Sequence, residues 1–177
     1  KSYIKGTIVI DLNGFTLNSR DSSVMIRAYA KSAVYPSEMV WKNGSIVTKK
    51  GALIAYQAQT AAGNGKQFIF RYEDISFKVE GAATSFFTKY TGAGSGVGQE
   101  VKCNSDIYLS NCTVDLTKAT AESILLFDLG DAYTSTNVIL DGVTVKSANG
   151  AFTLSGKTNA ASTGVLKGVG SSVTLQL

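Results

Sequence analysis

The chain has 177 residues, with 17 lysines and arginines against 13 aspartates and glutamates, a formal net charge of +4 and no histidine. The lack of histidine excludes Ser-His-Asp and Cys-His catalysis, imidazole zinc sites and acid–base chemistry by imidazole. The basic residues are scattered, with only Lys49 and Lys50 adjacent, so nucleic acid is not an expected partner. No apolar run reaches the roughly 18 residues of a membrane-spanning helix, so no membrane insertion is expected.

The composition favours strands joined by tight bends. The chain contains 18 glycines and a single proline, and it is rich in β-branched and aromatic residues. Its length is that of one domain, so we expect residues 1–177 to form a single domain. The repeat pattern described below begins by Ile8 and runs to Leu177. We therefore expect a fragment of a longer protein, with neighbouring segments or another chain covering the two open ends.

A six-residue phrase recurs five times along the chain. Its columns are a large apolar residue, a polar residue, Gly, Asn or Asp, a mostly apolar residue, Ser or Thr, and a final apolar residue. The copies occupy residues 12–17, 41–46, 72–77, 109–114 and 140–145. A repeat every 20–50 residues, roughly, indicates a solenoid, propeller or array.

The third column of the phrase predicts a sharp bend between two short strands. Gly, Asn and Asp are the residue types that tolerate a left-handed backbone. The predicted bend residues are Gly14, Asn43, Asp74, Asn111 and Gly142, which are 29, 31, 37 and 31 residues apart. The Ser/Thr column two places on should point outward and form a ladder across neighbouring strands.

Each repeat also carries a further apolar strand after the phrase, at residues 24–28, 53–57, 86–90, 125–129 and 152–156. A weaker sixth copy of the phrase covers residues 166–170, and residues 164–176 fit two registers. Three strands per repeat in this order predict an all-β fold. The specific prediction is a right-handed parallel β-helix solenoid of about five to six coils with three strands per coil.

The phrases IDLNGFTL, LSNCTVDL and ILDGVTV resemble coils of the pectin-lyase-like superfamily. That superfamily contains polysaccharide lyases, glycoside hydrolases, phage tailspikes and bacterial surface adhesins. The resemblance extends over about residues 7–177 and rests on coil-forming residues that members share whatever their activity. It therefore implies a fold and little chemistry.

The two cysteines are expected to be free thiols. Cys112 shares a column with Phe15, Ile75 and Val143, which should face the core, where free cysteine is common. Cys103 lies nine residues earlier at the edge of a predicted loop. A disulfide between them, which would join a loop to the core, is the less favoured alternative.

The predicted binding face is the outer side of the second apolar strand in each repeat. In pectin-lyase-like enzymes this face typically carries the catalytic cleft, so the resemblance points to it first. Alternation predicts an outward column of Arg27, Tyr56, Lys89 and Asp128, ending at Ser155. Tyr56 is the kind of aromatic residue that stacks on a sugar ring, with charged neighbours that bind acidic or hydroxyl groups.

Catalysis on this face would rest on few residues. A glycosidase needs two carboxyl groups about 5 to 9.5 Å apart, and Asp131 is the one candidate partner for Asp128, although it equally fits a turn. A calcium-assisted lyase would cluster several carboxylates with a base, and Lys89 beside Asp128 is equally explained as a surface ion pair. No cofactor is expected, with calcium left open as the alternative, and Asp128, Asp131 and Lys89 are only weak catalytic candidates.

A second outward column on the same strands is apolar: Met25, Ile54, Phe87 and Leu126. Soluble monomers rarely leave such a stripe uncovered. Loops could cover it, or it could pack on a neighbouring domain or subunit or bind a glycan. A third outward set, on the preceding strand, has the character of ordinary surface: Asp11, Val40, Arg71, Tyr108 and Ile139.

These patterns favour a non-catalytic structural or adhesive segment of an extracellular or cell-surface protein, with polysaccharide or a neighbouring protein as its partner. The first alternative is a fragment of a polysaccharide lyase or glycoside hydrolase. The second is a trimeric phage or viral fibre segment.

Overall fold

The computed structural model describes the backbone of residues 6–19, 24–28, 36–48, 54–58, 67–82, 85–88, 104–120, 124–128, 135–146, 152–156, 163–168 and 174–176. Side chains are described at residues 6–19, 38–48, 69–82, 86–87, 106–120 and 138–146.

Almost all described residues belong to β-strands, and the recorded strand pairs all run parallel. The larger sheet has ten strands: β1 (Gly6–Asp11), β2 (Thr16–Ser19), β4 (Pro36–Thr48), β6 (Gln67–Gly81), β8 (Asn104–Ser110), β9 (Thr113–Ala119), β11 (Ser135–Asp141), β12 (Thr144–Lys146), β14 (Thr163–Gly168) and β15 (Thr174–Gln176). The second sheet has five: β3 (Val24–Ala28), β5 (Ile54–Ala58), β7 (Ser85–Thr88), β10 (Ile124–Asp128) and β13 (Phe152–Gly156). The all-β prediction is confirmed.

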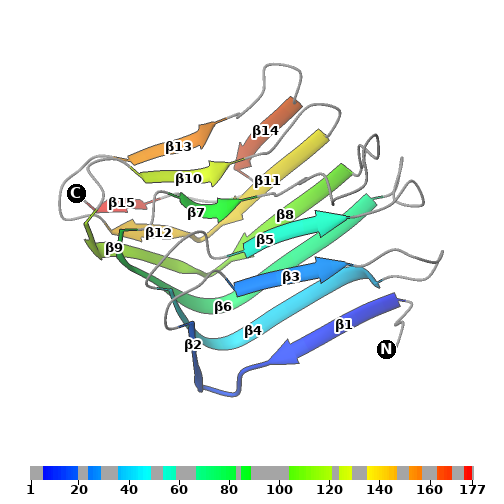
Figure 1. Ribbon diagram of the computed structural model, residues 1–177, viewed down its shortest axis with the longest axis horizontal. Coiled ribbons are helices and arrows are strands. Elements are labelled where there is room, and N and C mark those ends of the chain that lie inside the picture. Colours follow the sequence, from blue (N-terminus) through cyan, green and yellow to red (C-terminus); the bar gives the residue numbers. More distant parts are fainter. Residues whose placement is uncertain are drawn as a thin grey trace.

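The two sheets lie against each other (Figure 1). The five-stranded sheet is stacked in chain order, and the larger sheet consists of two such rows that share β4 and β6, one from β1 to β14 and one from β2 to β15. Aromatic side chains join the two sheets. Phe86 of β7 meets Phe77 of β6 edge-on, with ring centroids 5.0 Å apart, and Phe87 meets Phe70 at 6.3 Å. Such edge-to-face pairs contribute about 0.5–1.5 kcal/mol beyond the area they bury. The core therefore lies between the sheets.

The five predicted bend residues have left-handed backbones, with φ of 80° at Gly14, 59° at Asn43, 54° at Asp74, 52° at Asn111 and 60° at Gly142. In β4 and β6 the strand continues through the bend, whereas between β8 and β9 and between β11 and β12 the bend separates two strands. Gly142 is further constrained by its neighbour, because a Cβ there would lie 2.8 Å from Oδ1 of Asn111.

Register between neighbouring repeats follows the columns of the phrase from the second copy to the fifth. Trp41, Tyr72, Leu109 and Leu140 pair in sequence and are 8% exposed or less. The Ser/Thr ladder is continuous on the backbone across six strands: Thr16, Ser45, Ser76, Thr113, Thr144 and Thr174. Inward residues directly after it, such as Phe77 and Val114, are buried because strand alternation turns them toward the other sheet.

The first copy of the phrase departs from the predicted alignment. Ile10, not Leu12, pairs with Trp41, although Thr16 still pairs with Ser45. The first bend therefore holds two more residues than the second. Leu12 packs where a side chain on Gly44 would lie, and Phe15, predicted to face the core, is 72% exposed.

The last copy of the phrase is also displaced. Leu166 pairs with Val138, and Leu140 pairs with Gly168. The structure therefore settles the register that the sequence leaves open here: the sixth copy is offset by two residues from Leu140, and the ladder resumes at Thr174.

Replacing Asn111 with valine should destabilise the fold by about 1–3 kcal/mol, because a branched side chain would be forced into the left-handed region. Asn111→Gly is the matched control, since glycine adopts this conformation without a Cβ penalty. Urea unfolding measures both free energies. A loss below about 0.5 kcal/mol for Asn111→Val would contradict the role of the bend.

Tyr72→Phe should leave stability unchanged or raise it. The Tyr72 hydroxyl is buried and has no hydrogen-bond partner among the described residues, so the substitution removes an unsatisfied polar group while keeping the ring that packs on Phe77. Thermal unfolding of Tyr72→Phe beside Tyr72→Leu separates the hydroxyl from the ring. A loss of about 1 kcal/mol or more in Tyr72→Phe would show that the hydroxyl is satisfied.

Candidate functional site

The predicted binding column does not form in the observed register. Arg27 pairs with Gln57, and Tyr56 pairs with Ile26. Asp128 pairs with Thr88 and Gly156. The predicted alignment is therefore wrong by one residue between Arg27 and Tyr56 and between Asp128 and Ser155, and Asp128 pairs with Thr88 where Lys89 is predicted. Lys89 and Asp131 lie outside the described residues, and the proposed roles of all five in binding or catalysis stay predictions.

The apolar outer column is also altered. Phe87 pairs with Ile54, as predicted, but with Phe127 in place of Leu126, and Met25 pairs with Ala55. Phe87 itself is 1% exposed and contacts Phe70, so its predicted outward position is wrong. Phe86 is equally buried, as predicted. The short strand β7 therefore buries two consecutive aromatic residues against β6.

The most connected surface side chains lie on the outer face of β1, β4, β6 and β8. Arg71 points outward because Phe70 and Tyr72 on either side of it are buried. Its Nε donates a hydrogen bond to Oε1 of Glu38 at 2.6 Å, and its Cζ lies 4.2 Å from the centroid of the Tyr108 ring. Thr7 donates from Oγ1 to Oε2 of Glu38 at 3.0 Å. We call Thr7, Glu38, Arg71 and Tyr108 the Arg71 row.

The ion pair of the Arg71 row is partly exposed. The side chains of Arg71 and Glu38 are 35% and 23% exposed. The hydrogen bond from Arg71 lowers the pKa of Glu38, partial burial opposes this, and Thr7 and the guanidinium charge lower it further. An exposed ion pair contributes about 0.2–1 kcal/mol and a cation–π contact about 0.5–1 kcal/mol. The row therefore holds four neighbouring strands together modestly and presents charged groups to solvent.

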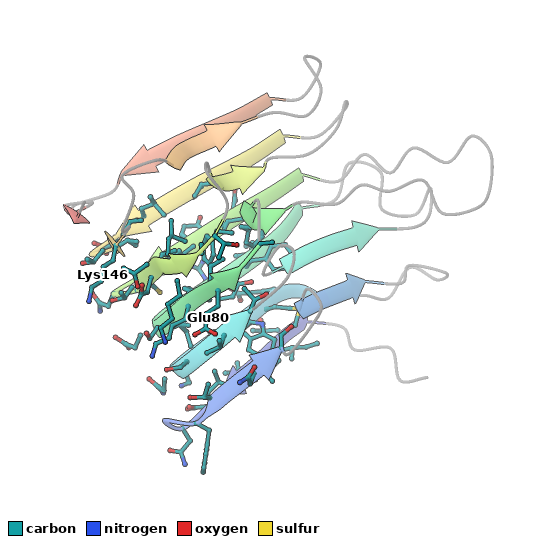
Figure 2. All side chains as sticks on the ribbon, turned by 60° about the vertical axis from the view of Figure 1, so that its left-hand side comes forward. Glu80 and Lys146 are labelled. Atoms are coloured by element: carbon teal, nitrogen blue, oxygen red, sulfur yellow. The ribbon has the colours of Figure 1, made fainter. Side chains whose placement is uncertain are left out.

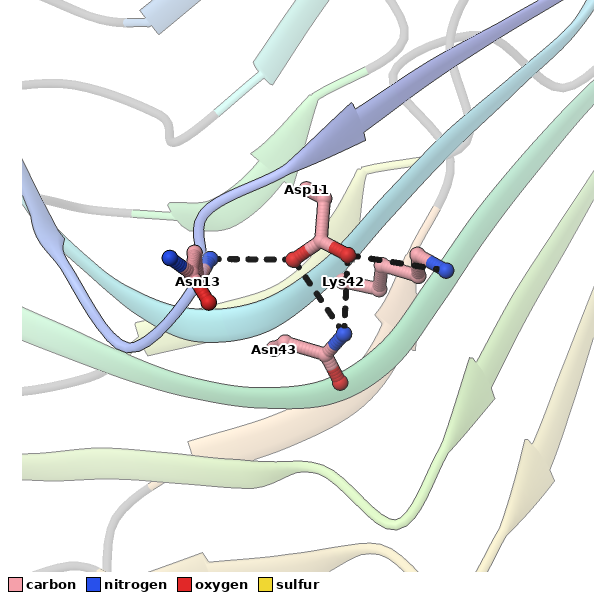
Figure 3. Close-up of polar contacts among 4 residues, drawn as sticks. All are labelled: Asp11, Asn13, Lys42 and Asn43. Carbon is pink, nitrogen blue, oxygen red and sulfur yellow. Dashed lines mark hydrogen bonds and ion pairs between the residues drawn. The ribbon is translucent and has the colours of Figure 1, made fainter.

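Asp11 organises the first bend (Figure 3). Its carboxylate accepts hydrogen bonds from the backbone N–H of Asn13 at 2.9 Å and from Nδ2 of Asn43 at 3.1 and 3.2 Å, and Lys42 Nζ lies 3.6 Å away. The bond from Asn13 is the main cause that lowers the pKa of Asp11, with Asn43 next. Sequence alignment had placed Asp11 beside Val40, but it pairs with Lys42.

A second outer face is formed by β2, the later halves of β4 and β6, β9 and β12 (Figure 2). Beside the Ser/Thr ladder, Asp115 lies in register between Lys78 and Lys146. Partial burial acts to raise the pKa of Asp115, but hydrogen bonds from Thr117 at 2.6 and 3.0 Å, with help from the two lysines, lower it overall. Next to this column, Lys118 Nζ lies 3.9 Å from Oε1 of Glu80.

These arrangements favour ionised, paired carboxylates over acid catalysis. The pKa values of Asp11, Glu38 and Asp115 are all lowered, whereas a general acid needs a raised one. Within the part of the chain that the structure describes, no group of three potential metal ligands occurs.

Cys112 is a free, buried thiol, as predicted. It lies 3.4 Å from the carbonyl oxygen of Tyr72 and 3.3 Å from that of Ser110, and burial raises its pKa to about 11. It therefore remains protonated near neutral pH and has the character of a core residue. Cys103 lies outside the described residues.

Sequence reasoning treated Arg71 and Tyr108 as ordinary surface. The signal that it missed is a run of complementary residues at the repeat spacing, since Glu38, Arg71 and Tyr108 are 33 and 37 residues apart. Their contacts depend on the register of β4, β6 and β8.

Comparison of the chain with protein-family models, with curated proteins and with solved structures finds no match in any of the three. Among the described residues, no helix has the length and apolar character needed to cross a membrane.

Arg71→Gln should raise the pKa of Glu38 toward its ordinary value of about 4.3. Because the folded-state pKa of Glu38 is lowered, its stabilising contribution is present above the unfolded value and is lost as pH falls through the folded value. The substitution should therefore cost more stability near neutral pH than in acid. NMR titration of the Glu38 carboxyl carbon measures the change in its pKa. Urea unfolding at neutral and at acidic pH measures the loss of stability.

The control is the same Arg71→Gln substitution made in a Glu38→Gln background. There the loss of stability should no longer depend on pH, because the carboxylate is absent, while the contact between Arg71 and Tyr108 is still tested. If the Glu38 pKa does not move in Arg71→Gln, the ion pair is not formed in solution.

Proposed function

We propose that the chain is part of a right-handed parallel β-helix of about five to six coils with three strands each, of the pectin-lyase-like kind. Parallel pairing between successive repeats and left-handed bends at the repeat spacing support this architecture. In a solenoid each repeat contacts only its neighbours, so stability accumulates along the stack.

We further propose that this segment is a non-catalytic structural or adhesive part of an extracellular or cell-surface protein. The support is the character of its described outer faces, where ionic groups pair with residues of adjacent strands. Such pairing produces rows of aligned side chains along the described faces. A glycoside hydrolase site would instead bring two carboxyl groups together and shift their pKa values in opposite directions.

The observation that carries a polysaccharide contact is the Arg71 row. It offers a hydroxyl, a carboxylate, a guanidinium and a phenol across four adjacent strands, which are about 4.8 Å apart. An extended row suits an extended polymer, because each strand supplies one polar or aromatic group for successive hydroxyl-bearing rings. Amphipathic tyrosine and bidentate arginine are both suited to such contacts.

A glycan array tests this proposal with the intact chain and with Arg71→Ala/Tyr108→Ala. We expect binding to an extended glycan that weakens at least tenfold in this double variant. The matched control is Lys78→Ala/Lys146→Ala on the other outer face, which should bind as the unchanged chain does.

A second double variant, Tyr56→Ala/Asp128→Ala, tests the face predicted from sequence. If only this variant loses binding, the contact lies on the five-stranded sheet and the Arg71 row is not the site. Cleaved glycan would favour a polysaccharide lyase or glycoside hydrolase, and absence of binding across the array would contradict the polysaccharide contact.

A further inference from the structure

Arg71 and Tyr108 belong to a column of outward residues that is otherwise apolar. The register of β1, β4, β6, β8 and β11 gives the members of this central column, which are Val9, Val40, Arg71, Tyr108 and Ile139. Tyr108 points outward as Arg71 does, because Ile107 and Leu109 on either side of it are buried. The middle of this face therefore offers aliphatic surface together with one guanidinium and one phenol.

Acidic residues lie in the two outward columns that border the central column. Strand alternation places each border column two residues away along the strands, which is roughly 6.6 Å. One border column contains Thr7, Glu38, Ile69 and Asp106. The other contains Asp11, Lys42, Glu73, Ser110 and Asp141. A polymer that lies along the central column would therefore have acidic side chains on both sides.

Both basic residues of this face are paired with acidic ones. Arg71 Nε lies 2.6 Å from Oε1 of Glu38, and Lys42 Nζ lies 3.6 Å from Oδ2 of Asp11. The pKa values of Asp11 and Glu38 are lowered, so both are carboxylates near neutral pH. The border columns also contain three further acidic residues, which are Glu73, Asp106 and Asp141. Among the described residues of this face, negative charge is therefore in excess.

The second outer face has the opposite balance of charged residues. Its described charged residues, which follow the bends, are Lys78, Lys118 and Lys146 against Glu80 and Asp115. The excess of acidic residues is therefore a property of the face that carries the Arg71 row and does not extend over both outer faces.

This distribution of charge distinguishes between polysaccharides. A carboxylate only accepts hydrogen bonds, so it needs a donor such as a sugar hydroxyl. A uronic acid carboxylate in the same position has no proton to donate and would lie beside like charges, which disfavour a wrong partner. The aliphatic and phenolic groups of the central column suit the apolar C–H faces of sugar rings.

We propose that this face binds uncharged polysaccharides and rejects those that carry uronic acids. The inference rests on the polysaccharide contact proposed above, and it names the class of polymer that the Arg71 row binds. The sugar rings lie along the central column against Val40 and Tyr108, and their hydroxyls donate to the carboxylates of the border columns.

A glycan array with matched pairs of probes tests this selection on the intact chain. The pairs are linear β-linked hexasaccharides of glucose and of mannose, each before and after oxidation of its primary hydroxyl groups to carboxylates. They are compared beside the other neutral and uronic-acid glycans of the array. We expect the neutral member of a pair to bind about tenfold more tightly at low ionic strength, and the difference to shrink as salt is added.

The double variant Glu73→Gln/Asp141→Asn tests the origin of the selection. It should raise the affinity for the oxidised probes about threefold, because two like charges are removed beside the central column. The affinity for the neutral probes should stay the same within about twofold, because Gln and Asn keep an oxygen that accepts a hydrogen bond. The matched control is Glu80→Gln/Asp115→Asn, which changes the charge of the chain equally on the second outer face and should leave the ratio of affinities unchanged. Circular dichroism checks that both variants are folded.

The outcomes separate this inference from the polysaccharide contact itself. Equal or tighter binding of the oxidised probes would overturn the selection while leaving the contact in place. An equal effect in the control and in Glu73→Gln/Asp141→Asn would also overturn it, because the charge of the whole chain would then set the preference. An array on which neither neutral nor acidic glycans bind would contradict the contact, and this inference with it.

Discussion

The left-handed backbone at one residue in each repeat is the constraint on which the rest of the structure depends. At Asn43, Asp74, Asn111 and Gly142 the chain turns without losing register with the repeat before it. Residues on both sides of the bend can then stay in their columns, so that Tyr72 and Phe77 on either side of Asp74 both enter the core. A Cβ-branched residue in this position would disfavour the left-handed backbone, and would therefore destabilise the strands on both sides of the bend.

Residue type was sufficient to predict the bends and the columns of the interior repeats, because Gly, Asn and Asp have a local reason to occur there. It was not sufficient for the first repeat. Ile10 and Leu12 are equally good apolar partners for Trp41, and only the pairing of β1 with β4 shows that the first bend has two extra residues. The same limit explains why Phe15 is predicted to face the core, whereas its side chain is 72% exposed.

The prediction of the binding face was the least accurate, because residue type alone did not determine its register. Arg27, Tyr56 and Asp128 were aligned across segments of unequal length, where a shift of one residue changes which side chains are neighbours. The predicted alternation of inward and outward side chains was also wrong in β7, because Phe86 and Phe87 are both buried where β7 packs on β6. The Arg71 row, in contrast, lies directly before the bends and depends on the part of the register that the phrase fixes.

Electrostatic contacts on the outer faces follow from the same stacking. Glu38 with Arg71, Asp11 with Asn43 and Glu80 with Lys118 join adjacent repeats, so each pair depends on correct register and adds a small preference for it. Their modest energies suit a surface whose order is set mainly by the core. Buried Tyr72 and Cys112 belong to that core and have no part in this surface.

The most direct test of the account is the backbone register of the Ser/Thr ladder, measured by NMR in an isotopically labelled chain. Nuclear Overhauser contacts should link the backbone of Ser76 to that of Thr113, and Thr113 to Thr144, with neighbouring residues following in parallel order. Contacts in antiparallel order, or displaced by one residue, would contradict both the bends and the columns built on them.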